Sequence, residues 1–172
     1  MAAAQRAFGV TEKSGARHGG GAREKIPIGA DHAGYAMKEL LKRELEQLGF
    51  AAVDLGAQSE QASDYPEFAH SVAQRVATGE ARRGVLLCGS GIGMDIVANR
   101  YPGVRAALAW EPAIAELSRK HNDSNVLVLP SRFMSEEDAV AALRAWLQTD
   151  FEGGRHQRRV EMIEPRGAAA GA

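Results

Sequence analysis

Short runs of apolar residues alternate along the chain with longer stretches in which apolar residues recur every three or four positions. Turn residues follow each short run, so these runs predict β-strands over residues 25–29, 51–55, 84–87, 105–109 and 126–129. The longer stretches predict helices over residues 35–48, 67–78, 112–121, 136–148 and about 155–163. The sequence Ser135-Glu136-Glu137-Asp138 is typical of a capping box and predicts a helix start at residue 136.

This alternation of strands and helices predicts an α/β fold with a parallel sheet, because each crossover between parallel strands must return across the sheet. Helices on both faces would give a three-layer α/β/α sandwich around a five-stranded, Rossmann-like sheet. Ligands of such sheets bind beyond the carboxyl ends of the strands. We therefore expect the chemistry in the loops after the strands, at residues 30–34, 56–66, 88–93, 110–112 and 130–132.

The two ends of the chain lack these patterns. Residues 1–24 are rich in Ala, Gly and Arg and have no helical or strand period, which favours a disordered extension over an organelle transit peptide. Residues 165–172 have a similar composition and predict a disordered tail. A single domain over residues 25–164 remains, and it is long enough to bury a core without staples.

Composition and charge argue against several functional classes. The chain has 172 residues, a formal net charge of -1 and one cysteine. A nearly neutral chain has no overall field that attracts nucleic acid or a membrane surface, so any anion site must be local. No apolar run approaches the roughly 20 residues that span a bilayer. A lone cysteine forms no internal disulfide, which fits a reducing cytoplasm.

The most informative segment runs from residue 84 to residue 99, where an apolar strand enters a glycine-rich turn and then a short helix. Cys88 stands at the junction and is followed by Gly-Ser-Gly-Ile-Gly. Unpaired backbone N–H groups at a helix start favour a thiolate and can also hold an anion. The turn is neither a P-loop nor a dinucleotide fingerprint, whose third glycine would stand at Met94. A structural turn with an inert, buried thiol is the alternative.

Other polar residues stand in or beside the strand-following loops, and each also has an ordinary structural interpretation. Asp31-His32 follows the first strand, where the pair could simply be a helix cap and a surface histidine. His121-Asn122 ends a helix, where a histidine also offsets the helix dipole. Ser90 could relay protons or cap the short helix.

The last predicted helix is strongly basic: it begins Arg-His-Gln-Arg-Arg and follows a Gly-Gly pair. Arg155 and Arg159 are four residues apart, so on a helix they share one face and could grip one phosphate together. A solvated basic helix end is the common alternative. Arg132, after the fifth strand, would complete an arginine cluster if the fold brings it near. The histidines show no spacing typical of metal ligands, and a single cysteine argues against a structural zinc site.

Six short motifs, in order along the chain, match a known family. They are Gly-Ala-Asp-His-Ala-Gly, Asp-Tyr-Pro, Cys-Gly-Ser-Gly-Ile-Gly, Ala-Asn-Arg, Arg-Lys-His-Asn-Asp and Glu-Gly-Gly-Arg-His-Gln-Arg-Arg-Val. Together they resemble the type B ribose-5-phosphate isomerases over residues 25–163. The resemblance implies a cytoplasmic enzyme that interconverts ribose 5-phosphate and ribulose 5-phosphate through a cis-enediolate, with no metal or other cofactor. It also implies a homodimer, or a tetramer, with each site between two subunits.

The resemblance further implies a role for each matching residue. Cys88 matches the general base that moves a proton between C1 and C2 of the sugar, and His121 matches the proton donor that opens the furanose ring. Ser90 and Asp31 match the other catalytic groups. The matching substrate contacts are Asp31, His32, Asn122 and the enediolate-stabilising loop of Gly89, Ser90, Gly91, Ile92 and Gly93. The matching phosphate contacts are His32, Arg132, Arg155 and Arg159.

Two residues depart from the family pattern. One branch of the family has a glutamate base where Met94 stands, so this chain would belong to the cysteine branch. Asp95 is acidic where relatives carry small or neutral residues. It either complements the helix dipole or changes which sugar fits.

Other functions stay open at this point. The substrate could be allose 6-phosphate, galactose 6-phosphate or a tetrulose phosphate instead. A non-catalytic module that binds a sugar phosphate or a nucleotide would keep Arg155 and Arg159 but would not need Cys88 and His121 together. A redox-sensing thiol would make Cys88 sensitive to peroxide without any proton exchange.

Overall fold

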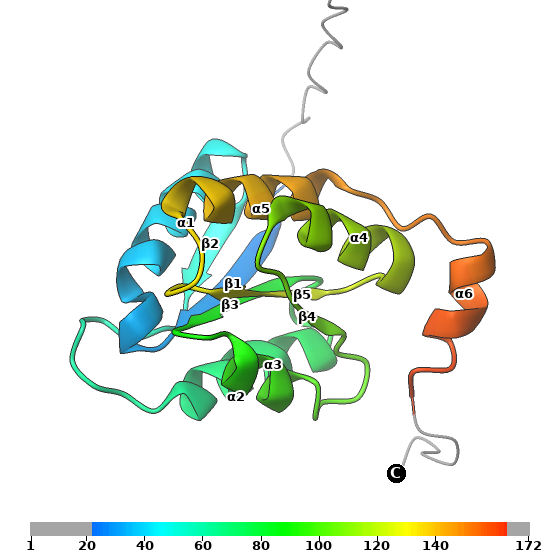
Figure 1. Ribbon diagram of the computed structural model, residues 1–172. Helices are drawn as coiled ribbons and strands as arrows, with labels where there is room; N and C mark the ends of the chain where they lie inside the picture. Colours follow the sequence, from blue (N-terminus) through cyan, green and yellow to red (C-terminus); the bar gives the residue numbers. More distant parts are fainter. Residues whose placement is uncertain (1–21, 165–172) are drawn as a thin grey trace, which may run out of the picture.

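The computed structural model describes residues 22–164 of the chain (Figure 1). The predicted tail over residues 165–172 lies outside the described residues, as does the predicted extension apart from residues 22–24. Glu24 accepts hydrogen bonds from the Arg83 guanidinium at 3.0 and 2.8 Å. Its backbone oxygen also accepts a hydrogen bond from Ala51 N at 2.9 Å. The described chain is therefore tied to the sheet from Glu24 onward.

The five predicted strands form one parallel sheet. They are β1 (Lys25–Ala30), β2 (Ala51–Asp54), β3 (Gly84–Cys88), β4 (Ala106–Leu108) and β5 (Val126–Pro130). Their order across the sheet is β2-β1-β3-β5-β4, so β1, β3 and β5 are neighbours. Each of these three strands runs one residue further than the apolar pattern predicts. Cys88 is therefore the last residue of β3, paired in register with Pro130 of β5.

Between residues 22 and 164, six α-helices connect or follow the strands. They are α1 (Tyr35–Gln47), α2 (Tyr65–Ala77), α3 (Ile92–Ala98), α4 (Pro112–Asn122), α5 (Glu136–Gln148) and α6 (Arg155–Val160). The start of α2 is two residues earlier than predicted, because Pro66 fits a first helical turn, where no N–H is required. The end of α6 is three residues earlier, because Met162 and Ile163 form backbone bonds of the i to i−3 type.

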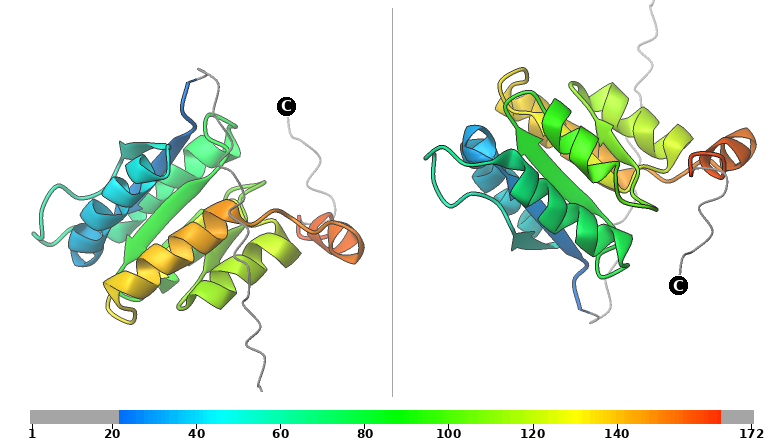
Figure 2. Two further views of the ribbon diagram at one scale, coloured as in Figure 1. Left: turned by 90° about the horizontal axis from the view of Figure 1, so that it is seen from above. Right: turned by 90° about the horizontal axis from the view of Figure 1, so that it is seen from below.

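Helices cover both faces of the sheet, so the predicted three-layer sandwich is confirmed. On one face lie α1, α4 and α5, and on the other lie α2 and α3 (Figures 1 and 2). Alternate residues of β3 enter the two resulting cores: Val85 and Leu87 join one, and Leu86 and Cys88 join the other. Each fully buried leucine stabilises the fold by about 1.5–3 kcal/mol. The predicted cap of α5 is also present, because Ser135 Oγ accepts from Asp138 N at 3.1 Å.

Candidate active site

The glycine turn after β3 holds the Cys88 thiol where the parallel strands have their carboxyl ends, which we call the carboxyl edge of the sheet. The side chain is only 5% exposed, and Gly91 N donates a hydrogen bond to its Sγ at 3.1 Å. Gly91 has a φ of 76°, and a methyl group there would lie 2.3 Å from Leu108 Cδ1, so the turn requires glycine. Ser90 and Ile92 beside it are exposed. An N–H group directed at sulfur stabilises the negative charge of a thiolate.

The loop after β5 is fastened to this turn by backbone hydrogen bonds. Ser131 N donates to Cys88 O at 2.9 Å, and Arg132 N donates to Gly89 O at 3.0 Å. Ser131 Oγ lies 3.0 Å from Ala33 O, so the same loop also reaches the segment after β1. The Arg132 side chain passes over Gly89, where an added methyl group would lie 3.3 Å from its Cδ. The structure therefore brings Arg132 beside the turn that follows Cys88.

The loop after β1 begins with a 3₁₀ helix over His32–Gly34 that the sequence pattern did not predict. Asp31 caps it, because Oδ1 accepts hydrogen bonds from Ala33 N at 3.0 Å and Gly34 N at 3.1 Å. Asp31 N donates to Leu87 O at 3.3 Å, which holds this residue against β3. Asp31 therefore does cap a helix, as its ordinary interpretation predicted, but it uses only one carboxylate oxygen to do so. The residue also lies at the same edge as Cys88.

His32 is held by a serine that the sequence reasoning did not identify. The backbone N of His32 donates to Ser63 Oγ at 3.1 Å, and Ser63 N donates to His32 Nδ1 at 3.2 Å. A backbone N–H can only donate, so Nδ1 is an acceptor and a neutral ring carries its proton on Nε2. Tyr65, in the Asp-Tyr-Pro motif just after Ser63, lies over Gly93, where an added methyl group would be 2.5 Å from Tyr65 Cε2.

The loop that carries Ser63 starts from a buried ion pair. Lys38 is fully buried, and its Nζ contacts Asp54 Oδ2 at 2.5 Å. Asp54 Oδ1 in turn accepts from Gly56 N at 3.0 Å. Burial opposes ionisation of Asp54, but hydrogen bonds from Lys38 and Lys42 hold its pKa below the usual value. The charged pair therefore fixes the first residues of the loop that reaches His32.

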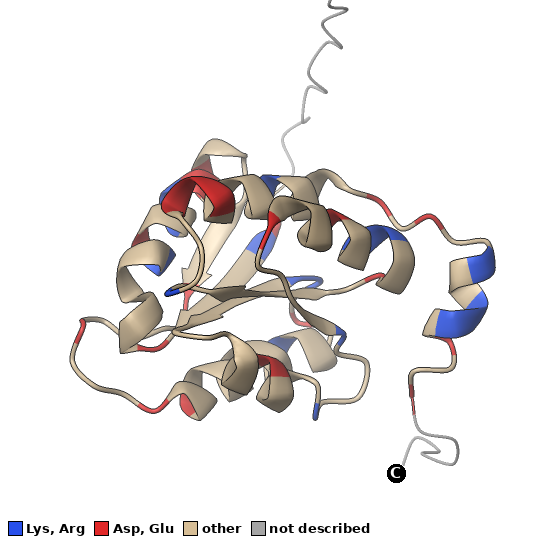
Figure 3. Ribbon diagram, in the orientation of Figure 1, with Lys and Arg blue, Asp and Glu red and all other residues tan. Residues whose placement is uncertain are grey.

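The remaining predicted residues lie where α4 meets α6. His121 and Asn122 end α4, and Arg155 and Arg159 stand on α6, which is the strongly basic helix in Figure 3. The His121 and His156 rings are stacked, with centroids 4.2 Å apart and planes inclined by 8°. A hollow of about 520 Å³ is lined by Gly154, Arg155, Arg158, Arg159 and Met162. We call this region the α4–α6 corner.

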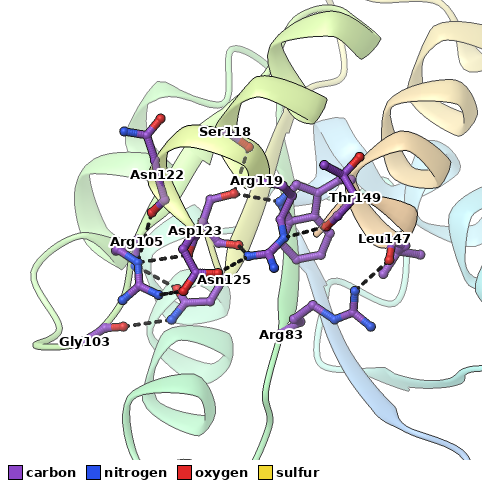
Figure 4. A network of polar contacts seen from close by, with 12 residues as sticks. Arg83, Gly103, Arg105, Ser118, Arg119, Asn122, Asp123, Asn125, Leu147 and Thr149 are labelled. Carbon is purple, nitrogen blue, oxygen red and sulfur yellow. Dashed lines mark hydrogen bonds and ion pairs between the residues drawn. The ribbon is translucent and has the colours of Figure 1, made fainter. Parts of the chain in front are cut away.

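The end of α4 is held by an aspartate in a left-handed conformation. Asp123 has a φ of 46° and follows the last residue of the helix. Its carboxylate accepts hydrogen bonds from Arg119 and from Arg105, each at 2.8 Å (Figure 4). Arg105 Nε also donates to the backbone oxygens of Asn122 at 3.2 Å and Asp123 at 2.9 Å. These contacts, which we call the Asp123 clamp, fix the backbone of the turn that carries His121.

Within one chain, the two groups of residues lie at opposite edges of the sheet. The α4–α6 corner precedes β5, whereas Arg132 follows β5 and lies with Cys88 at its carboxyl end. Because β5 has five residues, each rising about 3.3 Å, its two ends lie roughly 16 Å apart. In Figure 1 the carboxyl ends of β1, β3 and β5 lie on the left and α6 on the right. A single chain therefore does not bring Cys88 and His121 together.

The sequence reasoning also missed a cluster of possible metal ligands. Donor atoms of His121, Glu152 and His156 lie within 4.8 Å of one another. A histidine binds a metal through a lone pair that lies in the plane of its ring. A cation in the plane of one of these rings would be well outside the plane of the other, parallel ring, so the two cannot share it well. Arg155 Nε also donates to His156 Nε2 at 3.3 Å. This arrangement suits a stacked pair of rings better than a metal centre.

The two residues that depart from the family pattern lie on α3. Met94 is fully buried in the same core as Cys88. Asp95 has one buried carboxylate oxygen, Oδ1, without a hydrogen-bond partner among residues 22–164. Burial raises the pKa of Asp95, and hydrogen bonding to Asn99 and to the Leu108 backbone offsets part of this effect.

The fold and the carboxyl-edge residues together define the class of protein. A thiol with a directed N–H donor, beside an arginine and at the carboxyl ends of parallel strands, is the arrangement of a small-molecule enzyme of the α/β class. The comparisons with known proteins then identify the family. The sequence model described as Ribose/Galactose Isomerase matches residues 26–163, and the chain belongs to this family.

Individual relatives agree with this assignment. The chain is 45% identical over 140 residues to ribose-5-phosphate isomerase B of Escherichia coli, which covers 81% of this chain and 94% of the relative. The crystal structure of a ribose 5-phosphate isomerase from Thermotoga maritima has a TM-score of 0.79 and 46% identity, with 81% of this chain and 97% of that chain covered. A Mycoplasma genitalium ribose-5-phosphate isomerase B with bound ribulose-5-phosphate has a TM-score of 0.78 and 39% identity, with 81% and 93% covered. The resemblance noted in the sequence is confirmed.

Between residues 22 and 164, no helix combines the length and the apolar character needed to cross a membrane.

Proposed function

We propose that the protein interconverts ribose 5-phosphate and ribulose 5-phosphate. The observation that carries the proposal is the Cys88 turn, in which Gly91 N–H faces Sγ and Arg132 lies alongside. Support comes from the relatives, which are ribose-5-phosphate isomerases and include one with ribulose-5-phosphate bound. A cytoplasmic location suits this role, because a reducing compartment keeps the thiol free.

Cys88 acts as the base in this proposal. Its thiolate removes the proton from C2 of the open-chain aldose, and negative charge passes to the oxygen on C1 to give a cis-enediolate. The thiol then returns the proton to C1 while a proton moves between the two oxygens, which leaves the ketose. Backbone N–H groups of the loop Gly89, Ser90, Gly91, Ile92 and Gly93 stabilise the enediolate, with the Ser90 hydroxyl, because donors fixed in place lower the energy of a developing oxyanion.

Asp31 and His32 contact the sugar from the same edge of the sheet. Asp31 Oδ1 is occupied with capping, so Oδ2 is the oxygen available to a sugar hydroxyl. The Nε2–H of His32 is available to the phosphate or a sugar hydroxyl, because Nδ1 accepts from Ser63. Arg132 supplies a positive charge beside the Cys88 turn, where its side chain lies over Gly89.

The site is shared between two copies of the chain. His121 opens the furanose ring, Asn122 contacts the sugar, and Arg155 and Arg159 grip the phosphate, but in one chain these four lie at the edge opposite Cys88. A homodimer in which the α4–α6 corner of one copy faces the Cys88 turn of the other completes the site. Exposed apolar residues support the proposal that a second copy covers this face. The exposed fractions are 55% for Ile92, 51% for Ile96 and 56% for Trp110.

The experiment is an isomerisation assay on purified protein with ribose 5-phosphate, allose 6-phosphate, galactose 6-phosphate and a tetrulose phosphate. Each reaction is repeated in D₂O to detect deuterium on carbon. We expect turnover and exchange with ribose 5-phosphate, and loss of both in Cys88→Ala. Turnover of only another sugar phosphate would contradict the substrate assignment. Binding of ribose 5-phosphate without exchange would identify a binding module instead.

A further inference from the structure

We propose that His156 is a positioning residue, which holds the His121 ring in the orientation required for opening the furanose. This inference rests on the proposed function, because it assumes that His121 is the ring-opening proton donor. The Asp123 clamp fixes the backbone around His121 but does not touch its ring. The parallel stack on His156, with centroids 4.2 Å apart, restricts the rotation that remains.

His156 is itself firmly held, as a support for another ring must be. It is only 5% exposed, and its backbone N donates to Gly153 O at 2.9 Å. Glu152 N donates to Lys120 O at 3.1 Å, which ties the segment before α6 to the last turn of α4. Arg155 Nε donates to His156 Nε2 at 3.3 Å. The segment that carries His156 is therefore tied to α4, and Arg155 holds its ring.

The surroundings of His156 also favour its neutral form. Two parallel imidazolium rings at this distance repel each other, so at most one of them is charged. Burial, His121, Arg155 and Arg159 all lower the pKa of His156, and the more distant Glu152 carboxylate, 3.8 Å from Nε2, only partly opposes them. His156 is therefore the neutral partner. The half-buried His121 ring therefore stacks on a neutral aromatic face.

The test separates ring opening from proton transfer at carbon. Ribose 5-phosphate closes to a furanose through O4, whereas ribulose 5-phosphate stays open because its O5 carries the phosphate. Deuterium exchange from ribulose 5-phosphate therefore needs Cys88 but not ring opening. The variants are His156→Ala, His156→Phe, which keeps the stack, and Gln157→Ala, an exposed neighbour on α6, as the matched control.

At saturating substrate we expect His156→Ala to lower kcat for ribose 5-phosphate about tenfold or more. Its deuterium exchange from ribulose 5-phosphate should stay within about twofold of wild type, since that step does not use His121. His156→Phe should recover most of the lost kcat, and Gln157→Ala should change neither rate.

Three results would overturn the proposal. One is an equal loss of turnover and exchange in His156→Ala, with no rescue by phenylalanine, which would indicate a general structural role. Another is a higher KM for both substrates with unchanged kcat, which would assign His156 to phosphate binding. The third is unchanged turnover in His156→Ala. Failure of the wild-type protein to exchange deuterium would instead contradict the proposed function itself.

Discussion

The carboxyl edge of the sheet and the α4–α6 corner carry the two halves of the proposed site, but they are constructed differently. At the carboxyl edge, backbone hydrogen bonds join the segments after β1, β3 and β5, as in Ser131 N to Cys88 O. At the α4–α6 corner, side chains do most of this: the Asp123 clamp fixes the end of α4, and the His121–His156 stack joins it to α6, beside one backbone hydrogen bond from Glu152 N to Lys120 O. The first half follows from strand order, whereas the second depends on particular side chains.

This difference has a consequence for substitutions. A substitution in the carboxyl-edge loops leaves the backbone hydrogen bonds between them intact, provided that the new residue can adopt the same backbone conformation. Glycines are the exception, because Gly34, Gly91 and Gly93 are in close contact with other residues. At the α4–α6 corner, removal of one charged or aromatic side chain loosens the residues that it supports.

The largest effect is expected at the base. Cys88→Ala should lower kcat/KM for ribose 5-phosphate by roughly a thousandfold or more, because alanine has no group that can remove the proton from carbon. The fold should survive, since alanine fits a core position at a cost of about 1 kcal/mol. Steady-state kinetics and a thermal unfolding midpoint check the two statements. Full turnover by the variant would remove Cys88 from the mechanism.

The backbone of the carboxyl edge is tested by Gly91→Ala. The substitution combines a positive φ with a methyl group 2.3 Å from Leu108 Cδ1. Gly49→Ala is the matched control, because Gly49 has a φ of 87° but no atom within 4 Å of an added methyl group. The control should lose about 1–2 kcal/mol of unfolding free energy from backbone strain. Gly91→Ala should lose more and also lower kcat roughly a hundredfold. Equal losses in both variants would mean that close packing at Gly91 is unimportant.

The side-chain construction of the α4–α6 corner is tested by Asp123→Asn. Asparagine tolerates the left-handed conformation, so the variant keeps the backbone conformation of residue 123. It removes the negative charge with which Arg105 and Arg119 both pair. We expect a loss of about 1–3 kcal/mol in unfolding free energy and about a tenfold lower kcat for ribose 5-phosphate, with deuterium exchange from ribulose 5-phosphate less affected. Asp150→Asn, which neutralises an exposed carboxylate, serves as the control. A wild-type kcat in Asp123→Asn would show that the clamp does not support His121.

The smallest effect concerns Asp95, behind the carboxyl edge. Its folded-state pKa is raised above the usual value of 3.8 by burial, so folding favours the protonated form. The stability from this group is fully present below pH 3.8 and is lost as the pH rises through the folded-state pKa. Asp95→Asn should therefore raise the unfolding free energy at pH 7 and change it less near pH 4. Denaturant titrations at both values check this, and a lower stability of the variant at pH 7 would contradict it.

The sequence predicted the fold well, and it predicted which strand-following loops meet at the carboxyl edge. Apolar runs and helical periods placed all five strands, and parallel strand order put Asp31, Cys88 and Arg132 at one edge. Ser63 was missed because it stands alone in a polar loop, and its contact with His32 depends on the path of that loop. The order of elements along the chain did indicate that His121 is separated from Cys88. A helix that precedes a parallel strand ends near the amino end of that strand, whereas Cys88 stands at the carboxyl end of β3.

The α4–α6 corner was less predictable for a physical reason. The stack of His121 on His156 joins residues far apart in the chain, and its geometry depends on how α6 packs against α4. Asp123 gave no sequence signal for its left-handed conformation beyond being a residue type that tolerates it. Periodicity predicts which helix face is buried, but it does not say which polar side chains meet.

In the proposed homodimer, each active site combines the Cys88 turn of one copy with the α4–α6 corner of another. The most direct measurement mixes Cys88→Ala subunits with Arg159→Ala subunits, each inactive alone, by unfolding and refolding them together. A shared site predicts recovery of about a quarter of wild-type kcat, because half of the dimers are mixed and each of these has one intact site. If the mixture stays inactive while refolded wild-type protein recovers fully, each chain contains its whole site and the account is wrong.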